Sequence, residues 1–598
     1  MKTDTNASIR KGGSFLIEGT DPADVFTPED FNDEQKMFVK TAEDFVSNEV
    51  LPAMEKTEAK EEGVMVGLLK KAGELGLLMI DIPEAYGGLG LDKATSMAVI
   101  EAISRGGAFA TTYGGHAGIG TLPLILFGTE EQKQKYLTPI ATAELMSCYA
   151  LTEPGSGSDA LAARTRADLS PDRKHYLLNG SKVFITNGGF ADVFIVFAKV
   201  DGDKFSAFIL ERGMEGLTTG AEEKKMGIKG SSTVQVFMEN VKVPVENLLG
   251  EIGKGHKIAF NILNVGRFKL GVGCVGAAKI AFDDGVKYSI ERHQFGKPIS
   301  SFGMIQAKIA NMASRIYAVE SMSYRTAGLL DTILAPIGKD DADYAQKSMS
   351  GIEEYVAECS MMKIKGSEML DYVVDETVQI FGGYGFIADY PAERHYRDSR
   401  VARIYEGTNE INRMLLTGNL LKRSVKGELP LLLAAKKLAE ELLEGSPSLG
   451  ADEDVSLLSV EKGLIENAKK LSLLSLGVAA QKFGAKVEQE QQVLGNIADI
   501  IIETYGMESA WLRTMKLVEA NGEDNCKTHI AMTRLYCDEA MGRLDLWARE
   551  LLAACASGDE LRTMLAASRR LTKYTPIDSI HLREELARTF VEKGKWEL

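Results

Sequence analysis

The sequence predicts a mostly helical protein that carries one antiparallel β domain near its middle. Helical spacing of apolar residues, as at Phe38, Ala42 and Phe45, recurs over long stretches on both sides of the middle. Between about residues 146 and 250, short runs rich in Val, Ile and Phe are separated by turn residues, which is typical of antiparallel strands. The order along the chain is therefore helical, β, helical and helical.

These changes in the spacing of apolar residues divide the 598 residues into five segments. We expect an N-terminal arm that adds no core element, an N-terminal helical domain, the β domain, a helical bundle and an additional C-terminal helical domain, at residues 1–30, 31–145, 146–250, 251–425 and 426–598. The expected strands include residues 193–200, 205–210 and 233–238. Two polar stretches are predicted to be a loop or exposed helix start and a linker, at residues 338–346 and 445–454.

Composition argues against several classes of protein. The formal net charge is −16 and no long basic run offsets it, so nucleic acid is not an expected partner. The six cysteines are dispersed and form no CxxC pair, which argues against a disulfide framework or a metal site and favours the reducing cytoplasm. The first residues lack an apolar signal core, and the longest apolar stretches are too short to span a bilayer.

One glycine string matches a dinucleotide-binding fingerprint by spacing alone. Gly271, Gly273 and Gly276 stand in the order GxGxxG, and Glu291 follows 20 residues after the first glycine. The fingerprint requires a strand that leads into the first glycine, whereas the residues before Gly271 have helical spacing. We therefore reject nicotinamide binding here and expect these glycines to allow close packing of helices. No P-loop string is present.

Two loop strings have residues suited to a flat, polar ligand. In YALTEPGSGSD (149–159), backbone N–H groups with the Thr152 and Ser158 hydroxyls could bond a ring edge or a phosphate, although a plain loop between domains is an equal alternative. In FITNGGFAD (184–192), Phe184 could pack on a ring and Thr186 could donate a hydrogen bond, although a structural Asn-Gly turn explains the string as well.

Two further strings in the second helical region contain residues suited to a ligand. Arg292, in ERHQFGKPI, offers the donor fork that suits a diphosphate, although a lone Arg at a helix end is more often a surface residue. Gly382 and Gly383, in QIFGGYGF, allow a ligand or a backbone to come close.

Glu406 in RIYEGTNEINR follows an apolar pair. Partial desolvation there would raise its pKa and make it a useful base. An N-terminal carboxylate beside the helix start at Thr408 is an equal alternative.

Taken together, the strings resemble the acyl-CoA dehydrogenase family over about residues 35 to 425. They are LTEPGSGSD, FITNGG, EKKMGIKGSST, NVGRFKLG, RHQFGKPI, QIFGGYGF and YEGTNEINR, in the family's order. The extra C-terminal helical region, with the strings EEKKMGIK and NILNVGRF, looks most like the very-long-chain branch and its bacterial relatives. The resemblance implies a helical domain, a β domain and a helical bundle with FAD between them.

The resemblance also implies roles for individual residues. The flavin would be contacted by Tyr149, Leu151, Thr152, Gly157, Ser158, Phe184, Ile185 and Thr186, with Phe184 at a position where the family often has Trp. The ADP part of FAD would be contacted, largely across a subunit interface, by Arg292, Phe295, Gln379, Gly382 and Gly383. Thr408 and Glu410 would complete the FAD site. The substrate would lie near Ser158, Asn264, Arg267, Gly407 and Gly115.

Glu406 matches the family's catalytic base. Some family members carry the base immediately before the Arg that matches Arg267, and here that position is Gly266, so Glu406 has no rival. The implied reaction removes the α-proton to Glu406 and the β-hydrogen as hydride to FAD, giving a trans-2-enoyl-CoA in fatty acid β-oxidation. The alternatives are an acyl-CoA oxidase that uses oxygen and a flavin-fold binding protein without turnover.

Substrate length and partners are further expectations from the resemblance. Gly114 and Gly115 fall where bulkier side chains close the floor of the acyl pocket in medium-chain relatives, so we expect long-chain substrates, although tight helix packing explains these glycines nearly as well. The expected partners are an electron-transfer flavoprotein and a second subunit, in a homodimer whose extra domain covers the surface used for tetramers.

Overall fold

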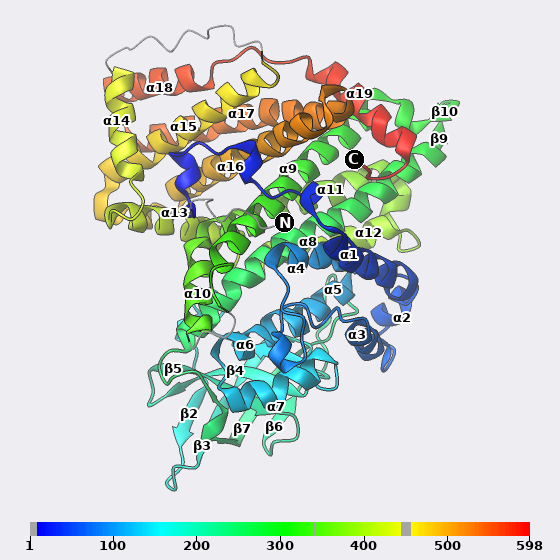
Figure 1. The fold of residues 1–598 in the computed structure, drawn as a ribbon, viewed down its shortest axis with the longest axis vertical. Coiled ribbons are helices and arrows are strands. Elements are labelled where there is room, and N and C mark those ends of the chain that lie inside the picture. The colour runs from blue at the N-terminus through cyan, green and yellow to red at the C-terminus, as the bar shows by residue number, and fades with distance from the viewer. Residues whose placement is uncertain (1–8, 339–342, 444–455) are drawn as a thin grey trace.

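The computed structural model describes residues 9–338, 343–443 and 456–598. Along its longest axis the β domain lies at one end, the long helices of the bundle lie in the middle, and the C-terminal helices lie at the other end (Figure 1). The predicted fold class, mostly helical with a central β domain, is confirmed.

The N-terminal helical region starts at a strong cap. Asn32 and Gln35 form a capping box, each side chain bonding the other's backbone N–H, so the helix begins at Asp33. Two π-helical segments, η4 (Val46–Val50) and η7 (Gly114–Gly120), interrupt the regular helices. The helices are α1 (Asp33–Phe45), α2 (Met54–Glu58), α3 (Val64–Glu74), α4 (Lys93–Ile103), α5 (Ala108–Tyr113), α6 (Leu122–Phe127) and α7 (Glu130–Ala141).

The β domain is an eight-stranded sheet in the order β6-β7-β3-β2-β4-β5-β8, with β1 paired to β4. Alternating buried and exposed residues in β7 match a sheet with one covered face, whereas β4 is buried on both faces and reads as a continuous apolar run. The expectation of a purely antiparallel domain needs one correction, because β1 and β2 both pair with β4 in parallel. The strands are β1 (Ser147–Ala150), β2 (Arg166–Leu169), β3 (His175–Thr186), β4 (Val193–Val200), β5 (Lys204–Glu211), β6 (Leu217–Thr219), β7 (Thr233–Pro244) and β8 (Leu248–Leu249).

The 37-residue helix α8 (Gly255–Glu291) is the centre of the bundle. Its glycines allow close crossings: a Cβ at Gly271 would lie 2.5 Å from the Met362 carbonyl oxygen, and one at Gly276 would lie 1.9 Å from the Glu101 carbonyl oxygen. The prediction that the GxGxxG string packs helices is therefore confirmed. By length and composition α8 alone among the described helices could cross a membrane, but 83% of its apolar window is buried inside the protein.

The other bundle helices surround α8, and a short hairpin follows it. They are α9 (Gly303–Leu334), α10 (Tyr344–Glu354), α11 (Val356–Phe381), α12 (Pro391–Ser399) and α13 (Asn409–Val425). The hairpin consists of β9 (His293–Gln294) and β10 (Lys297–Pro298).

The C-terminal helices pack on the bundle, mainly through α16 and α19 against α9. Buried ions join the two regions: Glu503 accepts hydrogen bonds from Lys365 of α11 and, at 3.1 Å, from Arg543 of α17. The elements are α14 (Leu431–Leu443), α15 (Ser459–Phe483), α16 (Gln491–Asn521), α17 (Lys527–Cys555), α18 (Gly558–Thr572) and α19 (Ser579–Lys593). The predicted linker at 445–454 lies outside the described residues, as do residues 339–342 of the predicted loop.

Residues 9–30 are a packed segment, so the expectation that the N-terminal arm adds no core element is wrong. Phe15 and Leu16 are buried in the main core, where the Phe15 ring lies edge-on to Tyr505. The segment runs across α15 and α16 (Figure 1), and Glu29 forms an ion pair with buried Arg513 at 2.5 Å. The sequence analysis missed this because the segment is mostly polar, and only Phe15 and Leu16 bury large apolar side chains in the main core.

Candidate active site

A cavity of about 860 Å³, here called the outer cavity, lies where the β domain meets α8, α10 and α13. Strand β1 and the loop after it supply one wall, and the end of β3 supplies another. The structure brings together in its lining many of the residues singled out from the sequence: Tyr149, Leu151, Thr152, Gly157, Ser158, Phe184, Ile185, Thr186, Asn264, Arg267, Glu406 and Gly407.

Glu406 is held at this cavity by an unusual backbone conformation. Its φ of 57° lies in the left-handed region, which costs a residue with a side chain about 1–2 kcal/mol. The surrounding structure fixes it: Arg267 donates from Nε to the Glu406 carbonyl oxygen at 3.1 Å, and Asn412 donates to the Gly407 carbonyl oxygen at 2.8 Å. Such strain, held by specific bonds, is typical of functional positions.

The Glu406 carboxyl group is desolvated. Burial raises its pKa to about 7, against the opposing attraction of the Arg267 and Lys363 cations. Its Oε2 is buried and has no hydrogen-bond partner in the part of the chain that the structure describes. A carboxylate with a pKa near neutrality is suited to take a proton.

The helix start that follows Glu406 is capped by a different residue. The Thr408 hydroxyl accepts a hydrogen bond from the Ile411 N–H at 3.3 Å and caps α13. Thr408 therefore serves a structural role in this chain, and Glu410 lies exposed on the first turn of the same helix.

Gly266 faces the same carboxyl group from α8. A Cβ at this position would lie 2.7 Å from Glu406 Oε2. Any side chain here would displace the carboxylate. Side chains at positions 266 and 406 would therefore occupy the same space, although they come from two different elements.

The lining of the outer cavity suits a ligand with a ring face and polar edges. Phe184 is 65% exposed, with φ of 59° at the rim. Three buried polar atoms of the lining lack partners among the described residues: Tyr149 Oη, Glu406 Oε2 and Asn419 Oδ1. Unsatisfied buried polar atoms are rare in native proteins, and a bound ligand explains them. This donor and acceptor set fits a flavin.

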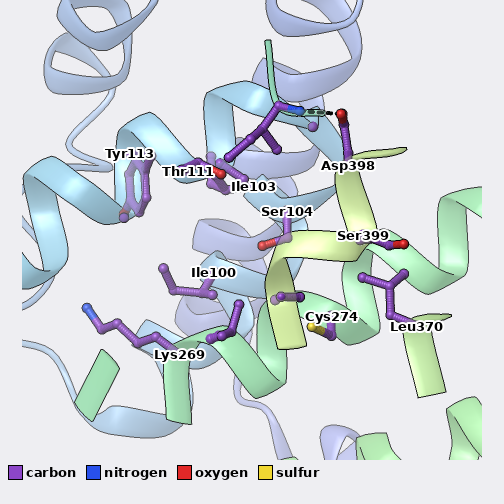
Figure 2. A pocket seen from close by; sticks show the side chains of 18 of the residues that line it. Ile100, Ile103, Ser104, Thr111, Tyr113, Lys269, Cys274, Leu370, Asp398 and Ser399 are labelled. Atoms are coloured by element: carbon purple, nitrogen blue, oxygen red, sulfur yellow. Dashed lines mark hydrogen bonds between the residues drawn. The ribbon is translucent and has the colours of Figure 1, made fainter. Parts of the chain in front are cut away.

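A second cavity, here called the inner channel, has Glu406 in its lining and lies between the N-terminal helices and the bundle. It shares four lining residues with the outer cavity: Ile119, Thr186, Tyr405 and Glu406. Ile100 and Ile103 from α4 line one side, and Cys274 of α8 and Leu370 of α11 line the other (Figure 2). The middle of the channel is therefore apolar.

Both glycines predicted to deepen the acyl pocket line the inner channel. A Cβ at Gly114 would meet nothing within 4 Å, so this position opens directly onto empty space. A Cβ at Gly115 would lie 3.0 Å from Thr186 Cγ2 and from Asn187 Nδ2. Gly114 therefore controls the free space, whereas Gly115 packs against the end of β3.

A second group of predicted cofactor residues lies elsewhere on the chain and lines neither cavity. Arg292, Phe295, Gln379, Gly382 and Gly383 are all exposed, on the β9–β10 hairpin and around the end of α11. Figure 1 shows this hairpin at the far end of the molecule from the β domain. Within one subunit, these residues cannot contact a ligand in the outer cavity.

Sequence reasoning missed Lys363. It is fully buried on α11, donates to Asn409 Oδ1 at 2.6 Å, and contributes to the electrostatic environment of Glu406. Burial lowers its own pKa to about 8. The available signal was a lysine inside the apolar run Met361–Ile364, because such a residue is seldom buried without a purpose.

Fold and site together define a class of protein: a helical and β fold in which a desolvated carboxyl group lies between a polar cavity and an apolar channel, an arrangement suited to an enzyme. The sequence matches four domain descriptions of one family: the acyl-CoA dehydrogenase N-terminal domain at residues 32–144, the middle domain at 148–241, and C-terminal domains at 253–421 and 467–570.

Proteins of the same family are similar to this chain over most of its length. A probable acyl-CoA dehydrogenase of Bacillus subtilis (strain 168) is 50% identical over 590 residues, which is 99% of each chain. The mitochondrial very long-chain specific acyl-CoA dehydrogenase of Homo sapiens is 35% identical over 89% of this chain and 81% of that protein. The crystal structure of an acyl-CoA dehydrogenase complexed with FAD from Bacillus anthracis superposes with a TM-score of 0.96 at 52% identity, covering 98% of this chain and 100% of that one.

The chain belongs to the acyl-CoA dehydrogenase family. It is a flavoprotein oxidoreductase that acts on acyl-CoA and uses FAD, with the additional C-terminal helical domain.

Proposed function

We propose that this enzyme oxidises long-chain acyl-CoA to trans-2-enoyl-CoA in fatty acid β-oxidation, with Glu406 as the catalytic base. One observation carries the proposal: Glu406, with its pKa raised to about 7, stands where the polar outer cavity meets the apolar inner channel. A thioester whose head lies in the first and whose chain lies in the second would present its α-carbon to this carboxylate.

The protein's own groups account for the proton chemistry. Glu406 takes the α-proton, and its backbone N–H, which has no partner among the described residues, can donate to the thioester carbonyl oxygen. A donor at that oxygen stabilises the negative charge that develops as the proton leaves. FAD, when bound, supplies the redox chemistry by accepting the β-hydrogen as hydride. Arg267 keeps Glu406 in position through the carbonyl bond described above.

The length of the inner channel supports a long-chain substrate. Gly266, beside the base, and Ile280 both line it and lie fourteen residues apart on α8, a distance of about 21 Å at about 1.5 Å per residue. An extended alkyl chain of tetrahedral carbons advances about 1.25 Å per methylene, so this length holds roughly sixteen of them. Gly114 adds open space beside this path.

We propose two sets of FAD contacts. The isoalloxazine would lie against Tyr149, Leu151, Thr152, Gly157, Ser158, Phe184, Ile185 and Thr186. The ADP part would be bound by Arg292, Phe295, Gln379, Gly382 and Gly383 of a second subunit, with Thr408 and Glu410 near the flavin. Phe295 is 93% exposed and Phe386 is 88% exposed, and exposed aromatics of this kind favour an interface. A homodimer satisfies both sets.

Ser158, Asn264, Arg267, Gly407 and Gly115 are proposed to contact the substrate, of which Gly115 lines the inner channel and the others line the outer cavity. The physiological acceptor is proposed to be an electron-transfer flavoprotein, and the compartment the cytoplasm. All six cysteines are free and buried, which suits a reducing environment. The five-segment division at residues 30, 145, 250 and 425 is retained as the proposed domain organisation.

An acyl-CoA length series tests the proposal. We expect a yellow protein with one noncovalent FAD per chain, and turnover that peaks near sixteen carbons with ferricenium or an electron-transfer flavoprotein as acceptor. A peak at four to eight carbons contradicts the channel assignment. Rapid reoxidation of the reduced enzyme by air in stopped flow favours an oxidase, and a colourless protein that gains no activity with added FAD contradicts the function.

A further inference from the structure

The far end of the inner channel differs in chemistry from its middle. The lining includes polar and charged side chains besides the aliphatic ones: Ser104, Arg105, Arg394, His395, Asp398 and Ser399. Arg105 and His395 lie near the Ile280 end, because they contact Asp283 and Asp284 of α8, whereas Ser104 lies beside Gly273. These residues come from the turn that follows α4 and from α12, and several are partly exposed. A channel that served only to hide a methyl end has no need of charged groups there.

The charges at this far end leave capacity for an anion. Arg394 makes no hydrogen bond or ion pair within the described part of the chain. Arg105 has only long contacts, at 3.4 Å to Asp283 and 3.9 Å to Glu43.

The acidic group that lines the channel, Asp398, is already engaged. It accepts a hydrogen bond from the Ile228 backbone N–H (Figure 2), and burial raises its pKa above the usual range. His395 contacts Asp284 at 2.9 Å. Asp283, Asp284 and Glu43 lie beside Arg105 and His395 but do not line the channel, so Arg394 is the group that offers an unengaged positive charge to an incoming ligand.

We propose that this far end is a subsite for an ω-carboxylate, so that the enzyme also oxidises the mono-CoA thioesters of long-chain dicarboxylic acids. The inference rests on the proposed function, because it places the thioester head at Glu406. The unpartnered Arg394 guanidinium is the main contact, and its donor fork matches a carboxylate. Arg105 adds positive charge beside it.

Chain length decides whether the subsite is reached. Over about 21 Å, a chain of roughly sixteen carbons brings its ω end to the charged residues. A chain of ten to twelve carbons would leave its carboxylate between Cys274 and Leu370, in the apolar part of the channel. A buried carboxylate without a partner is strongly unfavourable.

The test uses the FAD-loaded full-length enzyme with paired substrates of ten, twelve, fourteen, sixteen and eighteen carbons. Each pair is an acyl-CoA and its ω-carboxyacyl-CoA. The measured quantity is kcat/KM of the ω-carboxyacyl-CoA divided by kcat/KM of the acyl-CoA. We expect the ω-carboxyl member to be worse by at least about a hundredfold at ten carbons, the cost of a buried unpaired charge, and to reach parity at sixteen.

Variants assign the effect to the far end. Arg394→Gln should lower the ratio at sixteen carbons by about fivefold, the scale of a partly exposed ion pair, and Arg394→Lys should preserve most of it. Arg400→Gln alters an exposed arginine six residues further along that does not line the channel. This variant is the matched control and should leave the ratio at the wild-type value.

The outcomes distinguish failure of the ω-carboxylate subsite from failure of the proposed function. If palmitoyl-CoA is oxidised but the ω-carboxyl partner stays equally poor at every length, the subsite is wrong and the proposed function stands. A fall of the ratio in Arg400→Gln as large as in Arg394→Gln also overturns the subsite. If neither member of any pair is oxidised, both the function and the subsite fail.

Discussion

The outer cavity and the inner channel meet at one carboxylate, yet they are built from different kinds of residue. Polar groups, glycines and an exposed ring line the outer cavity, and they come from short strings with a recognisable order. The inner channel is lined in its middle mainly by aliphatic side chains and glycines from several helices, and apart from the residues of NVGRFKLG these are scattered along the sequence. Residues that contact polar ligand atoms therefore occur in recognisable sequence strings, whereas most residues that shape the channel for a given chain length do not.

The largest expected effect removes the base that both cavities share. Glu406→Gln keeps the size of the side chain but cannot accept the α-proton, so turnover should fall by about a hundredfold to ten-thousandfold. FAD content, measured by the visible spectrum, should change little, because a neutral amide is easier to bury than a carboxylate.

The exposed carboxylate Glu239 on β7 provides the control, and Glu239→Gln should behave as wild type. Retention of more than about a tenth of the wild-type turnover in Glu406→Gln is too much for the loss of a general base and would show that Glu406 is not the base. The paired change Gly266→Glu with Glu406→Gly should restore part of the activity, since both positions address one point.

The inner channel alone is altered by Gly114→Gln. The backbone at Gly114 is already in the helical region, with φ −63° and ψ −35°, so the new side chain enters open space without strain. We expect kcat/KM for palmitoyl-CoA to fall about ten- to hundredfold relative to that for butyryl-CoA, by overfilling of the channel.

Gly115→Gln is a less clean test of the same idea, because its Cβ would press on Thr186 at the flavin side. Gly67→Gln in α3, where a Cβ also meets nothing, is the matched control. An unchanged chain-length profile in Gly114→Gln would contradict the role of this channel in holding the chain.

Arg292→Gln tests the proposal that a second subunit completes the FAD site at the outer cavity. If the partner's Arg292 contacts the FAD diphosphate, the substitution should weaken FAD binding by about tenfold or more, the scale of a hydrogen bond to a charged group. Flavin release on dilution measures this, and light scattering should report a dimer. A monomer that retains FAD would defeat the shared-site proposal.

The smallest expected effect concerns pH. With its pKa raised to about 7, Glu406 in the free enzyme is protonated below this value, so kcat/KM should rise as pH increases through about 7. Lys363→Met removes a cation that lowers this pKa, and the rising limb should therefore move to higher pH by up to about one unit. A limb that stays in place would exclude an electrostatic role for Lys363.

Sequence reasoning reached the fold class and the residues of the outer cavity because strands, turns and loop strings are local in the chain. The apolar neighbours of Glu406 left two roles open and the resemblance to the family favoured the base, and the structure adds the left-handed backbone and the Arg267 bond that hold this residue. Sequence reasoning missed Lys363, because the apolar run around this lysine indicates burial but not its effect on Glu406, which lies 43 residues away in the sequence. The parallel pairings of β1 and β2 with β4 were equally hidden, because register between distant strands has no local signal.

The packed N-terminal segment has a consequence for biosynthesis. Glu29 leaves the ribosome early, but its ion-pair partner Arg513 is synthesised 484 residues later. Phe15 likewise needs Tyr505, so this segment cannot dock until most of α16 has been made. Contacts that span so much of the chain form slowly and late. We therefore expect residues 9–30 to stay accessible to protease on the nascent chain, and to become protected only after α16 has been made.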